Sequence, residues 1–441
     1  MERRAGHAVV LGASMGGLLA ARALTETYAR VTLLERDELP AEPLNRRGVP
    51  QGRHVHVLLP RGSQVLGSFF PGLAGELGLA GVPHTQLARQ IRFVVSGHRL
   101  TRGRPGPTML QPTRATLEHA VRRRVAALPG VEFVQGCDVS GLVASAGRVT
   151  GARFVRRSGA GGREETVEAD LVVDALGRSG RSVEWVSRLG YPAPAEERIK
   201  VGIKYVSCFF RTPPGALAPE QGILVGPVPG RTRGMAFMAC EGDRWLLTVA
   251  GMAGDHPPTD PGALVGFAGT IAPRDVHDVI VRSERLSDPV THAFPSSVRR
   301  RYEKLSAYPE GLLVFGDGLC SFNPIYGQGM TVASLQAEAL RACLATGRGD
   351  LAHRFYRAAA KVIDPAWQLS AAGDLALPEI TGPRPLLTRL INRYVSRLHR
   401  VGATDVAVAD AFWRVAGYLD PTPALLRPRV ALRVLTGGGG G

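Results

Sequence analysis

The sequence predicts an α/β protein with a Rossmann-like parallel sheet, an inserted mixed β-sheet and a helical C-terminal segment. Residues 8–37, 170–182 and 311–336 each place a short apolar strand before a glycine turn, and the first and third continue into a helical pattern. Four more strand-like runs, separated by Pro and Gly turns, follow within residues 201–252. From residue 365 onward the apolar spacing becomes helical and amphipathic.

The first stretch reads as a complete βαβ unit. Residues 8–11 and 31–34 are apolar runs, and residues 15–24 between them repeat apolar residues at helical spacing. The start of that helix presents unpaired N–H groups and a positive dipole end, which suit a pyrophosphate. Glu35 lies 23 residues after Gly12, close to the ~20-residue spacing at which a carboxylate binds an adenosine ribose. The unit therefore predicts a dinucleotide site.

The glycine turn departs from the GxGxxG fingerprint at one place. Gly12 and Gly17 hold the outer positions, Ser14 replaces the middle glycine, and Met15 and Gly16 complete the turn. The serine can donate a hydrogen bond through its hydroxyl. Glycine turns also serve plain packing of a strand on a helix, so the turn alone leaves both interpretations open.

The composition fits a globular protein of two or three domains. The chain has 441 residues, 44% of them hydrophobic and 21% charged, and it lacks the run of roughly 18 apolar residues that a spanning helix needs. The net charge is +16, but the arginines are scattered and only four lysines occur, so we expect no nucleic-acid partner. An acidic ligand, an anionic lipid or an acidic carrier protein remains open. Five dispersed cysteines without a CxxC pair indicate a reducing, cytoplasmic compartment and no metal site.

A basic loop at residues 46–62 follows the first unit. His54 and His56 would point to the same side of an extended chain, but no third ligand stands nearby, so a metal site is not expected. Arg53 offers a fixed cation to a negatively charged ring or a substrate oxygen. A solvated loop arginine is the alternative.

A helix is predicted over residues 113–128, with Thr113 as its N-cap. Arg114 lies in the first turn of this helix, where a cation opposes the helix dipole unless it serves an anion. Arg114 is therefore a candidate phosphate clamp.

The remaining segments of the first half are connections and strands. Residues 71–83 read as a glycine-rich connection, and residues 91–95 with 98–100 read as a hairpin. Residues 131–168 read as strands that include a small antiparallel excursion around the glycine-rich residues 158–162.

The other two glycine turns repeat the first pattern. Asp174 and Asp317 each follow an apolar run, so both should stand at the C-terminal edge of the parallel sheet, where open α/β sheets bind ligands. In the third stretch, a loop from Gly327 to Gly329 precedes a helix that starts at Met330. Such a turn offers backbone N–H groups to an anion or a carbonyl edge.

The inserted strands are expected to form one wall of a substrate pocket. Alternation places Met235 and Phe237 on one face of their strand, and Phe210 lies on a neighbouring strand. We select these three residues, with Pro324 and Tyr326 of the third stretch, as candidate pocket residues. Core packing explains such an apolar stripe equally well.

Taken together, the three glycine stretches resemble the FAD-dependent aromatic-hydroxylase class, group A, of flavoprotein monooxygenases. Within it, RRGVPQGRHVHVLLPRG and GDGLCSFNPIYGQGMTVASLQ resemble the flavin epoxidases that act on polyenes in bacterial polyether biosynthesis, and more distantly squalene epoxidase. The resemblance covers residues 7–345.

The resemblance implies a non-covalent FAD and assigns residues to it. Around the pyrophosphate and the adenosine it implies Gly12, Ser14, Met15, Gly16, Gly17, Glu35, Arg36, Arg114 and Val139. Asp174 and Asp317 are further cofactor contacts, with Asp317 at the ribityl chain. Around the isoalloxazine it implies Gly327, Gln328, Gly329 and Met330. Arg53 and His56 are further candidates near the flavin, and no catalytic residue is assigned with certainty.

The implied reaction is a monooxygenation. NAD(P)H, or a partner flavin or ferredoxin reductase, reduces the FAD, O2 adds at flavin C4a, and the hydroperoxide passes one oxygen atom to substrate. The expected substrate is an alkene of a hydrophobic polyene, polyketide or terpenoid intermediate of natural-product biosynthesis. Epoxidation of an alkene needs no catalytic base, and the sequence offers none. Hydroxylation of a similar substrate is the alternative.

Two departures from the family pattern leave the reductant open. The histidine that usually follows GD is absent, with Cys320 nearby, and DALGRSG replaces DGxxSxVR.

Three other classes share the predicted FAD unit. Flavin halogenases need, by family resemblance, an early lysine and a WxWxIP segment, whereas the first lysine here is Lys200 and no such segment occurs. A FAD-dependent polyprenyl reductase and a non-catalytic FAD-binding protein remain as alternatives.

The predicted domains are interleaved along the chain. Residues 1–200 and 285–365 form the FAD-binding domain, and residues 201–284 with 86–105 form the substrate-domain sheet. Residues 366–441 form the helical C-terminal region, which ends in a flexible glycine tail.

Overall fold

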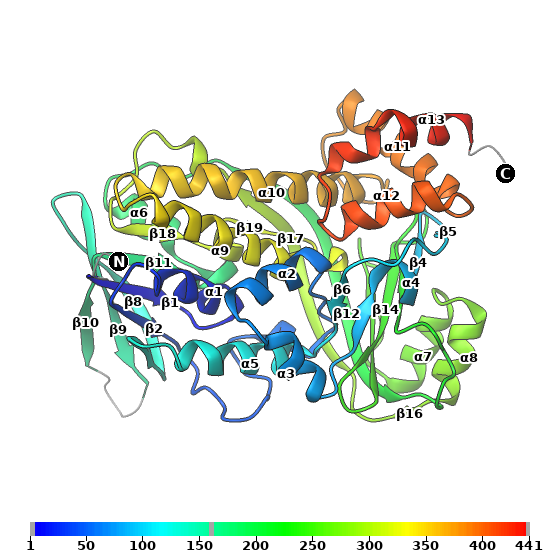
Figure 1. The fold of residues 1–441 in the computed structure, drawn as a ribbon, viewed down its shortest axis with the longest axis horizontal. Coiled ribbons are helices and arrows are strands. Elements are labelled where there is room, and N and C mark those ends of the chain that lie inside the picture. The colour runs from blue at the N-terminus through cyan, green and yellow to red at the C-terminus, as the bar shows by residue number, and fades with distance from the viewer. Residues whose placement is uncertain (1–4, 158–162, 438–441) are drawn as a thin grey trace.

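The computed structural model describes residues 5–157 and 163–437. Figure 1 shows an elongated molecule with a parallel sheet at one end, a larger sheet at the other and long helices between them. The C-terminal helices cover the end that holds the larger sheet (Figure 1).

The first sheet is five-stranded and fully parallel, which confirms the Rossmann-like prediction. Its strand order is β18-β11-β1-β2-β7. The strands are β1 (His7–Leu11), β2 (Arg30–Leu34), β7 (Val131–Val134), β11 (Leu171–Asp174) and β18 (Leu312–Val314). Because β18, β11 and β1 are neighbours and run in one direction, the turns that follow them lie at one edge of the sheet.

Helices cover one face of this sheet. They are α1 (Met15–Leu24), α2 (Pro60–Phe69), α3 (Leu73–Leu79), α5 (Arg114–Ala126), α9 (Gly329–Ala345) and α10 (Leu351–Leu375). Leu18, Val121 and Leu340 of these helices share a core cluster with Ala8 and Val10 of β1. The predicted connection at residues 71–83 contains α3, because Leu73 and Leu77, one helical turn apart, are buried in the same cluster.

A small antiparallel sheet, which the sequence predicted, and one helix cover the opposite face. The elements are β8 (Cys137–Ser145), β9 (Arg148–Arg156), β10 (Glu164–Glu168) and α6 (Ser182–Arg188). Phe154 and Trp185 pack with Val9 and Leu11 of β1. The glycine-rich residues 158–162 lie outside the described residues.

The larger sheet is mixed, as predicted, with the order β19-β17-β12-β15-β14-β13-β4-β5 and β16 paired to β12. Only β13 and β4 pair in parallel among its described strands. The strands are β4 (Ile91–Val95), β5 (His98–Arg99), β12 (Glu196–Arg211), β13 (Gly222–Val225), β14 (Arg233–Cys240), β15 (Arg244–Gly251), β16 (Glu284–Arg285), β17 (Val290–Arg300) and β19 (Cys320–Ser321). The predicted hairpin is β4–β5.

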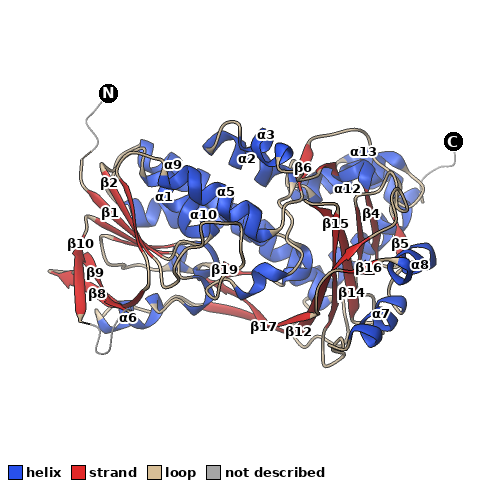
Figure 2. Cartoon of the chain, turned by 90° about the horizontal axis from the view of Figure 1, so that it is seen from below, coloured by secondary structure: helices blue, strands red, loops and turns tan. Residues whose placement is uncertain are grey.

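Strands β12 and β17 connect the two ends of the molecule. Their pairing extends from Glu196 opposite Arg300 to Ser207 opposite Val290, with a register shift between Lys200 and Ile203. Figure 2 shows both strands reaching from the middle of the molecule toward the larger sheet. Residues 296–300 of β17 pair with residues 196–200 of β12, which the sequence assigned to the same FAD-binding domain, and the rest of β17 pairs with the part of β12 assigned to the substrate domain. The domain boundaries stay a prediction.

Two helices, α7 (Pro261–Gly269) and α8 (Arg274–Arg282), cover the outer face of the larger sheet. Phe267 and Ile280 from these helices form a core cluster with Phe210 and Phe237 of the sheet. The shorter elements are β3 (His84–Gln86), α4 (Leu87–Gln90), β6 (Thr108–Leu110), η1 (Pro50–Arg53), η2 (Gly177–Ser179), η3 (Tyr302–Lys304), η4 (Gly316–Gly318) and η5 (Pro324–Tyr326).

The C-terminal region is helical. It consists of α11 (Leu386–Val401), α12 (Val406–Ala416), η6 (Thr422–Leu426) and α13 (Pro428–Thr436). Leu398, Val408, Leu425 and Val434 form a separate core cluster within it. The predicted flexible tail, residues 438–441 in particular, lies outside the described residues.

Candidate functional site

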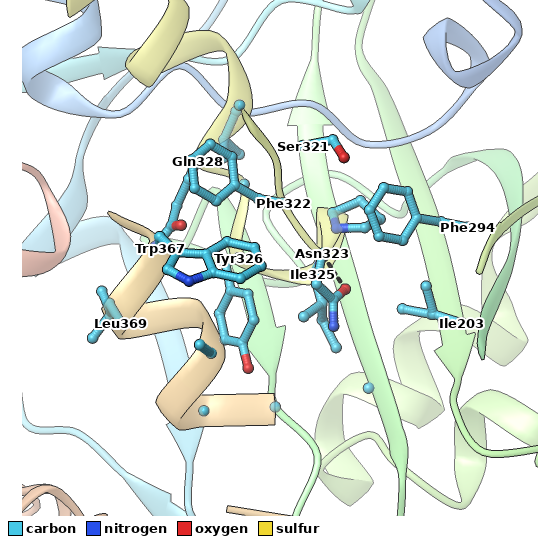
Figure 3. Close-up of a pocket in the computed structure, with 18 of the residues that line it drawn as sticks. Ile203, Phe294, Ser321, Phe322, Asn323, Ile325, Tyr326, Gln328, Trp367 and Leu369 are labelled. Atoms are coloured by element: carbon cyan, nitrogen blue, oxygen red, sulfur yellow. Dashed lines mark hydrogen bonds between the residues drawn. The ribbon is translucent and has the colours of Figure 1, made fainter. Parts of the chain in front are cut away.

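A single large cavity of about 1960 Å³ connects the turns of the parallel sheet with the larger sheet and the C-terminal helices. Figure 3 shows side chains from the third turn, from α10 and from β12 and β17 around this space. Among them are Tyr326 and Gln328 of the turn, Trp367 of α10, Ile203 of β12 and Phe294 of β17.

The three glycine turns converge at one edge of the parallel sheet. A Cβ atom built on Gly12 would lie 3.0 Å from the carbonyl oxygen of Ala175, and one built on Gly177 would lie 4.0 Å from the Cβ of Asp317. The turns after β1, β11 and β18 therefore touch in sequence order along that edge.

The first turn is closed by backbone contact. A Cβ on Gly17 would lie 1.8 Å from the carbonyl oxygen of Gly12, and Gly12 has a φ of +93°. Ser14 precedes α1 without a side-chain capping bond. The turn residues Ser14, Met15 and Gly16 line the cavity, so the N-terminus of α1 faces it.

Arg114 contacts the first turn, and its role as a phosphate clamp stays a prediction. Its Nη2 atom donates to Ser14 Oγ at 2.7 Å and to Glu118 Oε2 at 2.9 Å. Arg46 donates to Glu118 from the other side, over 2.7 Å. Burial opposes ionisation of Glu118, yet the guanidinium groups of Arg114 and Arg46 hold its pKa below its ordinary value.

The sequence reasoning missed Arg46 and Glu118. The spacing of Glu118 four residues after Arg114 is a signal that could have found one of them, because such residues face each other on a helix. Arg46 also pairs with Glu35 and Asp37, each at 3.0 Å. A buried chain of alternating charges thus ties the loop before η1 to the glycine turn.

Glu35 is buried beside the first turn. Its Oε2 atom accepts a hydrogen bond from the backbone N–H of Ala13 at 2.7 Å. The neighbouring Arg36 is exposed and lies outside the cavity lining. The ribose contacts of Glu35 and Arg36 stay predictions.

The two aspartates after β11 and β18 differ. Asp174 points away from the cavity, where it accepts from Leu176 N–H at 2.9 Å and from the Ser182 hydroxyl, and burial raises its pKa. Asp317 lines the cavity, and the surrounding protein raises its pKa against the opposing effect of Arg178 and Arg114. The Asp174 carboxylate is used within its own turn, and the cofactor contact predicted for Asp174 stays a prediction.

Arg178 is a cavity residue that sequence reasoning missed. Its guanidinium lies 4.1 Å from the centroid of the Phe294 ring, and burial lowers its pKa. By contrast, Arg53 is exposed and does not line the cavity. Val139 of β8 packs against the core cluster between the small antiparallel sheet and the parallel sheet. Neither residue therefore contributes to the cavity wall.

The third turn presents buried polar groups. Gly327, Gln328, Gly329 and Met330 all line the cavity, together with Pro324 and Tyr326. Gln328 Oε1 is buried and has no hydrogen-bond partner among the described residues. The turn leads directly into α9, so its N–H groups also face the cavity.

A carboxyl group lies behind the third turn. Asp374 Oδ1 accepts from the Asn323 side-chain amide at 2.8 Å and from the Tyr326 hydroxyl at 3.0 Å. Asp374 is fully buried, and burial raises its pKa to about 7. Its Oδ2 atom has no partner within the described part of the chain.

The two loop histidines are neutral at pH 7. Burial, with the nearby His56, His292 and Arg53, lowers the pKa of His54 to about 3, and burial with Arg114 lowers that of His56 to about 4. His54 Nδ1 shares a hydrogen bond with Ser207 Oγ at 2.7 Å, whereas His56 lines the cavity. No group of three or more His, Cys, Asp or Glu side chains in residues 5–157 and 163–437 is placed to bind a metal ion.

The far part of the cavity is apolar and uses the opposite face of the inserted sheet from the one predicted. Its walls include Phe93, Val95, Leu224, Ala236, Phe412 and Trp413. Phe210 and Phe237 were wrong as pocket residues, because their side chains are packed under α7 and α8. Met235 belongs to that same core cluster but also borders the cavity.

The fold is that of flavin-dependent monooxygenases and halogenases. The structure of flavin-dependent brominase Bmp2 aligns with a TM-score of 0.69 at 16% identity, over 98% of each chain. No protein-family model matches the chain.

Sequence relatives narrow the assignment. Protein Rv3254 of Mycobacterium tuberculosis is 38% identical over 437 residues, which cover 94% of this chain and 90% of that protein. The chain therefore belongs to the same family as Protein Rv3254. Kynurenine 3-monooxygenase of Salinispora tropica is 26% identical over 430 residues, covering 93% of this chain and 85% of that protein.

Proposed function

We propose that this protein is an FAD-dependent monooxygenase that transfers one oxygen atom from O2 to an alkene of a hydrophobic natural-product intermediate. The observation that carries the proposal is the convergence of three glycine turns at one end of a cavity whose other end is apolar. This arrangement suits a dinucleotide that lies beside a hydrophobic substrate.

The residues present fit FAD. The first turn leaves no room for a Cβ on Gly17, which keeps the start of α1 open to a pyrophosphate, and Arg114 supplies a cation there. The orphaned Gln328 Oε1 is a buried acceptor that would meet a ring N–H. Asp317, on the cavity wall, would accept hydrogen bonds from ribityl hydroxyls. When bound, FAD supplies the redox chemistry that activates O2.

The protein's own part is to orient the substrate and exclude water. Phe93, Leu224 and Trp413 offer an apolar surface to a polyene or terpenoid chain, with Phe294 and Phe322 nearer the turns. An alkene is nucleophilic enough to need no base, so these residues need only hold the double bond in place and keep the site dry.

Hydroxylation is the second candidate, and one observation favours it. The Tyr326–Asp374 pair, with a carboxyl pKa of about 7, offers a proton acceptor at the cavity wall. A substrate with an acidic hydroxyl could release its proton to this pair through Tyr326. Relatedness to kynurenine 3-monooxygenase points the same way.

Halogenation is less well supported despite the shared fold with a brominase. The family resemblance requires a lysine between flavin and substrate. All four lysines of this chain lie in described residues, and none lines the cavity.

Labelled oxygen tests the proposal. The purified holoprotein is incubated with ¹⁸O2, NADH or NADPH, and a panel of polyenes and phenols, and products are analysed by mass spectrometry. One ¹⁸O atom in an epoxide supports the proposal, one in a phenolic hydroxyl supports hydroxylation, and products without label refute both.

Electron supply separates the remaining classes. A polyprenyl reductase would oxidise NAD(P)H without matching O2 uptake, so an oxygen electrode distinguishes it. A non-catalytic FAD-binding protein would keep its flavin oxidised under anaerobic NAD(P)H, even with substrates and a ferredoxin or flavin reductase added.

A further inference from the structure

Exposed aliphatic side chains concentrate in the C-terminal helices. Twelve large hydrophobic residues of the described chain are exposed, and eight of them lie between residues 386 and 435. Single exposed leucines are ordinary, but a concentration of this kind marks an interaction surface.

The first two turns of α11 carry the core of this surface. Leu386, Leu387, Leu390 and Ile391 are 76%, 67%, 64% and 44% exposed. Their spacing places them along one side of the helix, and we call these four residues the α11 apolar lip.

The same side of α11 is covered further along. Leu398 and Val401 are buried against α12, η6 and α13. One side of α11 is therefore apolar along the whole helix. Its later turns are buried by α12, η6 and α13, and its first two turns are exposed.

Helix α13 adds to the lip. Arg397 of α11 donates to the carbonyl oxygens of Val434 and Leu435, both at 2.6 Å, which places the end of α13 beside α11. Leu432 and Leu435 of α13 are 64% and 63% exposed. Figure 1 shows α11 and α13 side by side at the outer end of the molecule.

The lip is the rim of the cavity. Leu387 and Ile391 are exposed and also line the cavity, and Val395 continues the lining one turn further. Arg384 fixes the turn before α11, because it donates to the carbonyl oxygens of Leu375, Leu377 and Ile380. An apolar path thus leads from the outer surface into the cavity over a well-anchored helix.

Positive charge surrounds this apolar surface. Residues 384–436 contain nine arginines and three aspartates, a net charge of +6. Asp405 pairs with Arg433, Asp420 with Arg414, and Asp410 accepts from the backbone of Arg104. The arginines at positions 389, 393 and 400 of α11 remain exposed to an external anion.

The combination favours lipid over a protein partner. Helices with leucines on one side and arginines around them bind the interface of anionic membranes. Protein interfaces are instead centred on tryptophan or tyrosine anchors, and the exposed large residues here are Leu, Ile and Val. No helix of the described residues is long and apolar enough to cross a bilayer, so contact would be with one leaflet.

We propose that the α11 apolar lip and the adjacent face of α13 dock on the surface of an anionic membrane, with the cavity rim turned toward the lipid. A hydrophobic substrate then enters the cavity from the bilayer without crossing water. The entry of substrate rests on the proposed function, whereas the docking itself does not.

Vesicle flotation of the full-length holoprotein tests the docking. Wild type should float with vesicles of phosphatidylcholine and phosphatidylglycerol, and much less with phosphatidylcholine alone. The double variant Leu386→Glu/Leu390→Glu, whose positions do not line the cavity, should lower the bound fraction about ten-fold, because charge on the lip opposes insertion. Leu79→Glu, at a leucine 94% exposed on α3, is the matched control and should bind as wild type does.

A second variant separates charge from insertion. Arg389→Gln/Arg393→Gln should weaken binding to anionic vesicles several-fold and leave the weak binding to phosphatidylcholine unchanged. The melting temperature and flavin absorbance of each variant show whether the fold and the FAD site are intact, so loss of docking is distinguishable from failure of the proposed function.

Three results would overturn the docking proposal. Wild type could fail to float with anionic vesicles, or the Leu386/Leu390 double variant could float as well as wild type. Light scattering could also show a dimer that the double variant dissociates, without vesicle binding, which would assign the lip to a second copy of the chain.

Discussion

The two ends of the cavity are built in opposite ways. At the parallel-sheet end, backbone atoms touch across the first glycine turn, and Arg46, Glu118 and Arg114 form a buried chain of charges around it. At the other end, the rings of Phe93 and Trp413 pack against each other within a cluster of apolar side chains. The first end specifies one ligand geometry, whereas the second can accept many apolar shapes, because dispersion and hydrophobic contacts carry little directional preference.

The sharpest test of this contrast is Gly17→Ala. The added Cβ would lie 1.8 Å from the Gly12 carbonyl oxygen, and that backbone cannot move without displacing the end of β1. We expect a loss of about 5 kcal/mol or more in the free energy of unfolding, measured by chemical denaturation. Gly16→Ala is the matched control, since its nearest neighbour would be Phe315 Cδ1 at 3.7 Å, and it should stay within about 1 kcal/mol of wild type. Equal midpoints for the two variants would show that the turn is not closed as described.

Phe237→Ala tests which face of the inserted sheet binds substrate. Phe237 is fully buried under α7 and α8, so its truncation should cost about 3–5 kcal/mol of unfolding free energy. The remaining folded protein should bind hydrophobic ligands as wild type does. Phe93→Ala, on the cavity side, should cost less stability and weaken ligand binding. If a ligand titration instead showed weaker binding for Phe237→Ala and unchanged binding for Phe93→Ala, the substrate would bind on the face of the sheet that the sequence predicted.

Asp374→Asn tests the polar group that borders the apolar part. The folded protein holds the Asp374 proton up to about pH 7, against an ordinary carboxyl pKa of 3.8. Between these values the unfolded chain binds fewer protons, so this residue makes stability fall as pH rises, with no further change above pH 7. The variant lacks the contribution, and its stability relative to wild type should rise by up to roughly 4 kcal/mol from pH 4 to pH 7.

Comparison of urea unfolding at several pH values isolates this effect. His54, His56 and His399 have lowered pKa values and charge as the pH falls, but they do so in both proteins and cancel in the difference. A constant difference across the pH range would contradict the raised pKa of Asp374.

Arg114→Met should have the smallest effect of these variants, and the quantity it should change is the affinity for FAD. It removes the hydrogen bond to Ser14 and one partner of Glu118. We expect FAD affinity to fall about ten- to a hundred-fold, the worth of one charge-assisted hydrogen bond, in a fluorescence titration. Arg123→Met removes a cation from the exposed side of the same helix and should leave the affinity unchanged. Equal losses of FAD affinity in both variants would show that Arg114 acts only through its positive charge and not through a specific contact.

The two ends also differ in how far the sequence predicts them. Gly12 to Gly17 and the capped start of α5 are local patterns, and Thr113 caps that helix as expected. The sequence could not show that Arg46 reaches Glu118, because no local spacing links residues in different elements. Asp174 followed the expected pattern in sequence, but a serine eight residues later draws its carboxylate away from the cavity.

The apolar end was the less predictable one for the same reason. Alternation along β14 correctly separates Phe237 from Ala236, but it cannot say which face α7 and α8 will cover. Phe412 and Trp413 lie more than three hundred residues after Phe93 and reach it only through the packing of α12. Tertiary packing therefore decides where the substrate wall lies, whereas local turn chemistry decides where the cofactor end lies.

The paired strands β12 and β17 run from the parallel-sheet end of the cavity to the larger sheet. Ten residue pairs join them, five on each side of the register shift between Lys200 and Ile203. Under the proposed function, the part of the chain that joins the two ends sets the length between a reactive ring atom at one end and a bound double bond at the other. Changing that length by engineering would require insertions in both strands at once.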